Sequence, residues 1–397
     1  MRLSRINMMI ARAPVMLAWR NATSDKRRLL RAASGIGLAA ALILVQLGFR
    51  EAFLESALSL FRAIDGDLII LSPTRYQLGQ RETFPRQRMY QALALPEVQS
   101  ATPMYFEWIN SRWRSPSDDK AFLIRVVAVD PANPALRLEG LAENGAALTQ
   151  PGTAMMDRRG RRFLGDIVPG LVSELNGRGI HIVATFPMGP DFIVDGTLLM
   201  SERNYLTYFG AGSGGDVDRL RAQIDYGVIK LRPGADSRKV REALRQLLPG
   251  DVNILTRDEV IALETDYQNS VTPVGAIFGL GALIGVLVGT LIAYQILFTE
   301  ISDRRAQFAT LKAIGYQPRY LLGVIVRQSL LYGIAGFVPA LLVSQLAFTA
   351  IDRGFLIPMR ISGEIFVATL LMVLTICVAA GIIAARRALT ADPAEVF

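Results

Sequence analysis

Four long and mostly apolar runs stand out along the chain. They cover residues 32–53, 273–298, 320–350 and 365–385. An α-helix needs about 20 mostly apolar residues to cross the hydrocarbon layer of a bilayer. Three such runs near the end of the chain would be unusual inside a soluble core. The pattern therefore predicts four transmembrane helices at these positions.

The stretch between the first two runs, residues 54–270, has a different pattern. Short β-like runs separated by Pro, Gly and Asn lie at residues 67–72, 122–130, 180–186, 226–231 and 252–256. A helix is expected after Asp236 and Ser237, with one apolar face formed by Val240, Leu244, Leu247 and Leu248. The predicted fold class is a membrane α-helical protein with four transmembrane helices and a large α+β periplasmic domain between the first and second spans.

Positive charges beside the apolar runs orient the helices. Residues 1–31 hold eight Lys or Arg against Asp25 alone, the loop 299–319 holds four, and the tail 386–397 begins with Arg386 and Arg387. The loop 351–364 has two basic and two acidic residues. Because cytoplasmic loops carry the excess of Lys and Arg, both termini and the loop 299–319 are expected in the cytoplasm. The expected location is the bacterial inner membrane, with the domain 54–270 and the short loop 351–364 in the periplasm.

The basic N-terminal segment does not have the pattern of a cleaved signal peptide. It is too long, and no small-residue cleavage site follows the first run, which predicts an uncleaved signal-anchor helix. Residues 14–20, with Trp19 at headgroup level, are expected to form a short interfacial helix. A flexible basic tail is the alternative.

Composition agrees with this arrangement and narrows the chemistry. Apolar residues make up 51% of the chain, charged residues 20%, and the formal net charge is +8. The basic residues gather at the ends of apolar runs without interleaved aromatic residues, so we expect no nucleic-acid partner. The single cysteine, Cys377, excludes an internal disulfide. The single histidine, His181, is interpreted as an ordinary strand residue.

Nucleotide-binding and catalytic motifs are absent from the sequence. It contains no GxxxxGK[ST], GxSxG or HExxH pattern, and the glycine-rich residues 210–215 are interpreted as a flexible loop. We therefore expect no enzymatic activity, no bound cofactor and no metal site in this chain.

The second apolar run carries glycines at a regular spacing. Gly281, Gly285 and Gly289 are four residues apart, and Gly275 and Gly279 are offset from them. Glycines at this spacing leave one helix face without side chains, so that another helix can approach at backbone distance. The partner is either the third or fourth span of the same chain, or a second copy across a two-fold axis.

Two residues of the third run interrupt its apolar pattern. Pro339 lies inside the run and predicts a kink. Arg327 is expected to extend toward the cytoplasmic interface, and a role in a substrate path is the alternative.

The loop between the second and third runs has an amphipathic pattern. A helix is expected with Asp303 or Ser302 as its cap and Gly315 at its end. Its apolar side is expected to be Phe308, Leu311 and Ile314, flanked by Arg304, Arg305 and Lys312. A helix fixed between two spans can convey a partner's motion to the bundle, although on the pattern alone an ordinary interfacial loop helix is the preferred interpretation.

Several stretches resemble one family. One span, a large outer domain and three further spans, together with TLKAIGY at 310–316 and ARRALTADPAEVF at 385–397, resemble the MacB/FtsX-like permeases of ABC transporters. Residues 45–73, 84–93 and 272–316 are similar to the DevC-type permeases of the heterocyst-glycolipid exporter group. The outer domain from about 110 to 265 matches that group only loosely.

The resemblance implies partners and a mode of action. It implies a homodimer bound to two copies of a separate ATPase subunit, which would hold ATP and Mg, and a periplasmic membrane-fusion adaptor with an outer-membrane channel. It further implies mechanotransmission, in which residues 300–315 form a coupling helix seated on the ATPase and the outer domain moves the adaptor. The coupling residues implied are Glu300, Asp303, Arg304, Arg305, Gln307, Phe308, Thr310, Leu311, Lys312, Ile314 and Gly315. Related loops commonly have Glu at the position of Gln307, so an ion pair to the ATPase is not expected there.

These features favour a permease that exports a lipid, a glycolipid or another hydrophobic molecule. An FtsX-like signalling protein that controls a periplasmic enzyme is the second hypothesis, and a lipoprotein-releasing permease is the third. A membrane-bound enzyme ranks last because no catalytic set is found.

Overall fold

The computed structural model describes residues 26–210 and 217–389. The expected interfacial helix at 14–20, most of the glycine-rich loop 210–215 and the tail from 390 onward lie outside the described residues. The chain forms two compact units. We call the first, which includes Val274–Ala350 and the segments up to Glu51 and from Met359, the membrane unit, and the second, Ala52–Pro273 with Ile351–Pro358, the outer domain.

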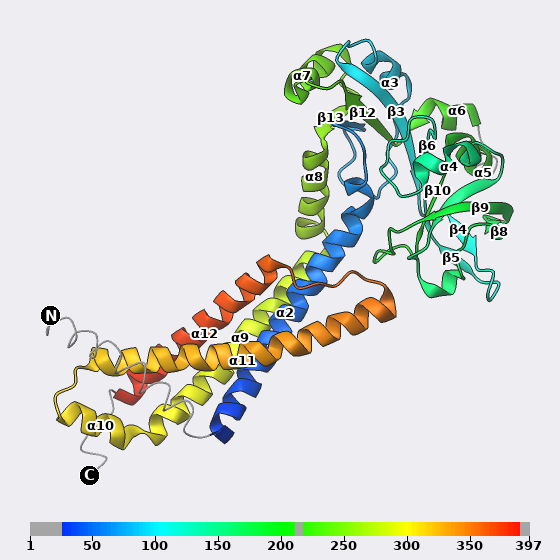
Figure 1. Cartoon of the computed structure of the whole chain (residues 1–397). Coiled ribbons are helices and arrows are strands. Elements are labelled where there is room, and N and C mark those ends of the chain that lie inside the picture. The colour runs from blue at the N-terminus through cyan, green and yellow to red at the C-terminus, as the bar shows by residue number, and fades with distance from the viewer. Residues whose placement is uncertain (1–25, 211–216, 390–397) are drawn as a thin grey trace, which may run out of the picture. The chain divides into compact units, whose positions relative to one another are not determined.

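Within the described ranges, four helices are long and apolar enough to cross a membrane: α2 (Lys26–Arg62), α9 (Pro273–Asp303), α11 (Pro318–Phe355) and α12 (Gly363–Leu389). Figure 1 labels each of them. The helix α2 starts before the expected residue 32 and continues past 53, because the amphipathic stretch after Arg50 keeps helical periodicity. The helix α11 begins at Pro318, where the missing N–H costs nothing, and continues through Pro339.

The glycine face of α9 packs against α2. A Cβ placed on Gly285 would lie 2.9 Å from the Ile43 side chain, and one on Gly289 would lie 3.0 Å from Ala39 Cβ. A Cβ on Gly281 would overlap the end of Gln46. The partner of this face is therefore the first span, which differs from both expected alternatives. The reason is that the glycines leave room on α9 for Ile43 and Gln46, and Ala39 of α2 is itself small, so the two helices approach closely.

The helix α2 also meets α11 at backbone distance. A Cβ on Gly37 would lie 2.9 Å from the Gly336 carbonyl oxygen, and a Cβ on Gly336 would lie 3.0 Å from the Gly37 backbone nitrogen. Further along, Gly48 faces the ring of the buried Phe348. Close packing on both sides makes α2 the central helix of the membrane unit.

Arg327 lies on an exposed part of α11. Its guanidinium donates a hydrogen bond of 3.0 Å to the carbonyl of Gly323, one turn nearer to Pro318. The side chain therefore extends toward the start of the helix and away from the bundle interior, which agrees with snorkelling toward the interface.

The outer domain begins with a split β-α-β arrangement. It is formed by β1 (Leu68–Leu71), α3 (Gln87–Ala92), β3 (Val98–Glu107), β12 (Tyr226–Leu231), α7 (Ser237–Leu247) and β13 (Asn253–Thr256). The strand order is β13-β1-β12-β3, with every neighbouring pair antiparallel. This is the ferredoxin-like order. Figure 1 shows α3 and α7 together beside these strands.

A second lobe is inserted between β3 and β12. Its strands are β4 (Arg112–Arg114), β5 (Ala121–Leu123), β6 (Arg125–Val129), β7 (Thr153–Asp157), β8 (Val172–Leu175), β9 (Arg178–Phe186) and β10 (Thr197–Ser201). Its helices are α4 (Leu141–Leu148), α5 (Glu202–Gly210), α6 (Val217–Ala222) and the short 3₁₀ turn η1 (Arg162–Leu164). Because β3 also pairs with β6, the sheet continues into the inserted lobe as β6-β10-β7-β9-β8-β4-β5. The two short strands β2 (Phe84–Pro85) and β11 (Gln223–Ile224) pair separately.

The predicted α+β class is confirmed. The apolar run at 122–130 forms two strands, β5 and β6, because the chain leaves the first ladder at Ile124 and enters another. The predicted helix after Asp236 is α7, with the Asp236 side chain accepting a bond from the Arg238 N–H. Val240, Leu244 and Leu248 are buried, whereas Leu247 is 44% exposed, which differs from the expected face.

The close approach of α9 to α2 predicts a specific sensitivity. Gly285→Leu should lower the free energy of unfolding by about 1–3 kcal/mol, because the added side chain cannot fit beside Ile43. Gly279→Leu is the matched control, since no atom lies within 4 Å of a Cβ at that position. Thermal unfolding of both variants in the same detergent tests this, and equal melting temperatures would contradict the packing.

Candidate functional site

The segment between α9 and α11 contains the short helix α10 (Arg305–Ala313). The expected cap at Ser302 or Asp303 is wrong, because both residues belong to α9 and the single turn residue is Arg304. The chain continues as helix through Asp303, whose carboxylate lies 3.0 Å from the guanidinium of Arg28. The coupling segment, defined here as residues 300–316, therefore starts inside a membrane helix.

A buried carboxylate holds this segment to the bundle. Glu300 is 6% exposed, and one of its oxygens accepts a bond of 2.6 Å from Arg304 Nε. Its other oxygen lies 3.6 Å from the guanidinium of Arg28, at the start of α2. One carboxylate thus joins the end of α9, the turn before α10 and the first turn of α2. We call these residues, with Asp303, the charge clamp.

Apolar contacts fix one face of α10. Phe308 is buried in the core of the membrane unit, and Leu311 packs against that core. Ile314 is 71% exposed, so the expected alignment of all three residues is wrong. Three residues make less than one full helical turn of 3.6 residues. Two such steps, from Phe308 to Ile314, therefore rotate the Ile314 side chain away from the face that Phe308 and Leu311 share.

Gly315 ends the helix. Its φ is +101°, and the N–H of Tyr316 donates a bond of 3.1 Å to the carbonyl of Leu311. This is the 6→1 bond of a Schellman motif, which favours Gly at the left-handed position. The motif turns the chain sharply, and it leaves Ile314 and Tyr316 exposed at the tip.

Uncharged side chains are exposed on the outward face of the coupling segment. Gln307 and Thr310 are exposed, and Thr310 Oγ1 donates to the carbonyl of Ala306. Arg305 is half-buried, and the side chain of Lys312 lies outside the described part of the structure. With Ile314 and Tyr316, the described side chains of this face offer amide, hydroxyl and apolar groups, which suit a protein partner.

The helix α8 (Arg257–Ser270) is tied to the outer domain just before the second span. It starts with a capping box between Thr256 and Glu259. Glu264 is 5% exposed and accepts a bond of 2.7 Å from the N–H of Leu78. The ring of Tyr267 lies 5.7 Å from that of Tyr76. These contacts attach α8 to the loop that follows β1.

Beneath this loop lies a buried ionic cluster. The Arg75 guanidinium lies 3.5 Å from the Asp225 carboxylate and 4.2 Å above the ring of Tyr226. Burial raises the pKa of Asp225 to about 6, although Arg81 and Arg75 act in the opposite direction. The cluster connects β1, β3 and β12 at the junction of the two lobes.

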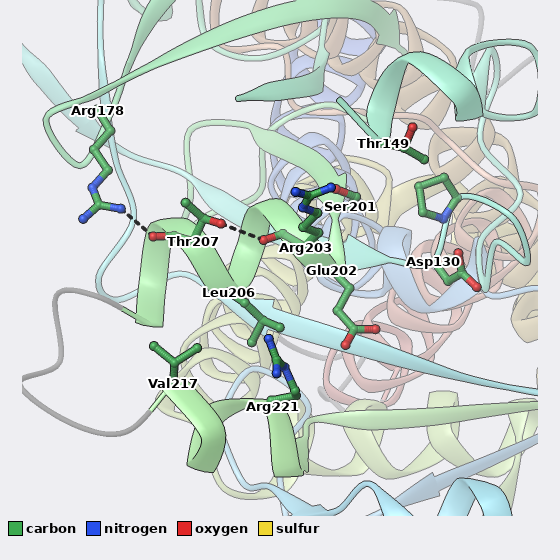
Figure 2. A pocket seen from close by; sticks show the side chains of 11 residues that line it. Asp130, Thr149, Arg178, Ser201, Glu202, Arg203, Leu206, Thr207, Val217 and Arg221 are labelled. Atoms are coloured by element: carbon green, nitrogen blue, oxygen red, sulfur yellow. Dashed lines mark hydrogen bonds between the residues drawn. The ribbon is translucent and has the colours of Figure 1, made fainter. Parts of the chain in front are cut away.

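The inserted lobe also holds an open cavity of about 740 Å³. Figure 2 shows Arg178 bonded to the Thr207 carbonyl, and Arg203, Glu202 and Arg221 on the surrounding helices. The lining mixes guanidinium, carboxylate and apolar groups. In the described ranges, no three His, Cys, Asp or Glu side chains are grouped so that they could hold a metal ion.

Two family models together match most of the chain. Residues 30–247 match the MacB-like periplasmic core domain, and residues 274–393 match the FtsX-like permease C-terminal domain. The first model alone spans more than half of the sequence. The chain belongs to the MacB/FtsX permease family.

Individual relatives of this family are more distant. An uncharacterized ABC transporter permease of Methanocaldococcus jannaschii is 28% identical over 179 residues, which is 42% of this chain and 44% of that protein. The match thus spans less than half of the relative's length.

Among solved structures, the periplasmic region of MacB from Actinobacillus actinomycetemcomitans is 14% identical, with a TM-score of 0.36 over 53% of this chain and 97% of that chain. The extracellular domain of the noncanonic ABC-type transporter YknZ from Gram-positive bacteria is 9% identical, with a TM-score of 0.33 over 48% and 100%.

The structure of this family member brings together residues that the sequence analysis did not connect. Glu300 and Asp303 pair with Arg28, which the sequence pattern gave only as one of many orienting charges, and Glu300 also pairs with Arg304. An available signal was the acidic pair at the end of one span, opposite the basic start of another. The pairing itself depends on which helices are neighbours.

The charge clamp predicts how firmly α10 is held. Glu300→Gln keeps the side-chain size but removes the charge that binds Arg304 and Arg28. We expect a local loss of about 1–2 kcal/mol, less than for a fully buried pair because Arg28 is partly exposed to solvent. Amide hydrogen exchange over residues 304–311 should then be roughly tenfold faster. Gln307→Ala, at an exposed position of the same helix, is the control, and unchanged exchange in Glu300→Gln would refute the clamp.

Proposed function

We propose that this chain is the membrane subunit of an ABC-type exporter, working by mechanotransmission. Membership of the MacB/FtsX permease family supports this, and so does the name of the M. jannaschii relative. The similarity of residues 45–73, 84–93 and 272–316 to DevC-type permeases favours a lipid, a glycolipid or another hydrophobic cargo. ATP and Mg are assigned to a separate ATPase subunit.

The observation that carries the proposal is the two-sided environment of α10. One side is fixed by Phe308, Leu311 and the charge clamp, and the other exposes Gln307, Thr310 and Ile314. A helix that packs against the bundle on one side and is exposed on the other can transmit a displacement caused by a bound partner to the helices against which it packs. Because Glu300 is bonded to Arg304 and paired with Arg28, a displacement of α10 would move α9 and α2 together.

Along the chain, two helices follow this path into the outer domain. The helix α2 is unbroken from Lys26 to Arg62, and its last turns bury Leu60 and Phe61 in a core of the outer domain. The helix α8 is fixed by Glu264 and Tyr267 before the chain enters α9. The helix α2 therefore ends inside a core of the outer domain, and residues 271 and 272 join the anchored helix α8 to α9. This arrangement supports movement of a periplasmic adaptor and its outer-membrane channel.

A homodimer is the assembly that we propose. The glycine face of α9 is already occupied by α2, so a second copy would use another face. Exposed apolar residues follow a 3-4-3-4 spacing on that helix: Ile277, Leu280, Ile284, Leu287 and Leu291. This is the spacing of a left-handed helix pair. Two permeases would then present two coupling segments to an ATPase dimer.

The exposed tip of the coupling segment should be required for ATPase binding. Ile314→Asp places a charge where an apolar contact is proposed, and we expect at least about tenfold weaker association with the ATPase that co-purifies with the native chain. Both Ile314 and the control position Val271 are exposed, at 71% and 65%, so neither substitution disturbs a core.

Val271→Asp makes the same chemical change in the outer domain and should leave the ATPase bound. The measurement is the ATPase recovered with the affinity-purified permease, normalised to permease. Recovery that is the same for Ile314→Asp and the native chain would refute the proposed docking.

A further inference from the structure

Two loops of the inserted lobe expose apolar side chains beside a run of arginines. Residues 157–163 read DRRGRRF and residues 188–194 read MGPDFIV. Phe163 is 42% exposed, Phe192 38% and Ile193 56%. We call the two segments together the arginine-aromatic rim.

The rim is held in one conformation by two carboxylates. Asp157 is fully buried and accepts bonds from the backbone N–H groups of Arg159 (2.9 Å), Met188 (2.9 Å) and Gly189 (2.7 Å). Asp191 accepts 2.7 Å bonds from the N–H groups of Ile193 and Val194, and pairs with Arg125 at 3.1 Å. Since these bonds fix the backbone, the exposed apolar side chains are held outward by the fold.

Contacts inside the outer domain join the rim to α2 and to α11, in each case just after the apolar stretch of the helix ends. Arg162 donates a bond of 3.3 Å to the carbonyl of Arg353. Residues 328–351 of α11 carry no charge, and Arg353 follows this uncharged stretch after Asp352. The ring of Phe192 lies 5.0 Å from that of Phe53, which comes shortly after the uncharged residues 32–49 of α2. A charge-free stretch of this kind is the part of a helix that lies in hydrocarbon, so both contacts place the rim at headgroup level.

The charge of the rim suits phosphate groups. Two of its arginines are neutralised by carboxylates: Arg158 by Glu139 at 3.1 Å and Arg161 by Asp195 at 2.9 Å. Arg159 and Arg162 have no carboxylate partner among the residues that the structure describes. Guanidinium groups bind phosphate oxygens through charge-assisted hydrogen bonds.

We propose that the arginine-aromatic rim is a lipid-contact surface that binds anionic phospholipid headgroups of the leaflet on the side of the outer domain. Arg159 and Arg162 bind the phosphates, while Phe163, Phe192 and Ile193 enter the interfacial layer, where aromatic side chains are favoured. A single basic residue near an anionic surface contributes about a fivefold gain in binding. This inference goes beyond the proposed export function, because it requires the membrane spans but no ATPase.

The test uses the full chain alone in vesicles of phosphatidylethanolamine and phosphatidylglycerol that contain doxyl-labelled phospholipid. A fluorophore is attached at Ile193→Cys, at Phe163→Cys and, as control, at Tyr90→Cys. Tyr90 is 63% exposed on α3, which lies at the other end of the same domain (Figure 1). The native Cys377 is buried, and the unsubstituted chain measures any labelling there. We expect strong quenching at 163 and 193 and little at 90.

A second arm tests the charge. Reversing Arg159 and Arg162 together to Glu should abolish most of the quenching at 193, and so should replacing phosphatidylglycerol by phosphatidylcholine. Reversing the exposed Arg238 and Lys239 of α7 to Glu changes the net charge equally and should have no effect. The proposal is overturned if the three labels are quenched equally, as expected for a rim that binds only a protein partner. It is also overturned if quenching at 193 is indifferent to both the lipid charge and the two arginines.

Discussion

The close approach of α2 to its neighbours is the constraint on which the rest of the structure depends. Helices in lipid gain little from hydrophobic burial, so they associate through dispersion contacts that require a short interaxial distance. Here Gly281, Gly285 and Gly289 remove side chains from α9, and the pair Gly37 and Gly336 does the same where α2 crosses α11. With α2 held on two sides, its start becomes a fixed point at which Arg28 can meet Glu300 and Asp303. The charge clamp is therefore a consequence of the helix packing.

The helix α2 is long enough to contribute residues to both the membrane unit and the outer domain. It extends from Lys26 to Arg62, and Leu60 and Phe61 near its end are buried in a core of the outer domain. The second connection, through α8, is anchored by a buried glutamate that bonds to the backbone of Leu78. Mechanotransmission, which we propose for this chain, requires segments of this kind that are anchored in the outer domain.

The pattern of apolar and polar residues along the chain predicts the large features of the fold. It does not predict which helices and which charged side chains contact one another. The long apolar runs predict the four candidate spans, and the short β-like segments predict the α+β insert. The two differ because a membrane helix needs one long apolar run, whereas strands are short runs bounded by turn residues. The glycine spacing predicts a close helix contact, but the identity of the partner depends on the tertiary arrangement, and α2 was missed. Ile314 was assigned to the apolar side of α10 by three-residue spacing, whereas the helix rotation and the turn at Gly315 place it outside. The ferredoxin-like strand order and the charge clamp join segments far apart in sequence, for which a single sequence carries no signal.

The central claim is that the coupling segment and the outer domain lie on opposite sides of the membrane. It is tested most directly by a membrane-impermeant maleimide applied to spheroplasts, with one cysteine placed at Ile314 or at Tyr90, both exposed positions. We expect labelling of the Tyr90→Cys protein in intact spheroplasts, and labelling of the Ile314→Cys protein only after the membrane is permeabilised. Labelling of Ile314→Cys from outside intact spheroplasts would contradict it.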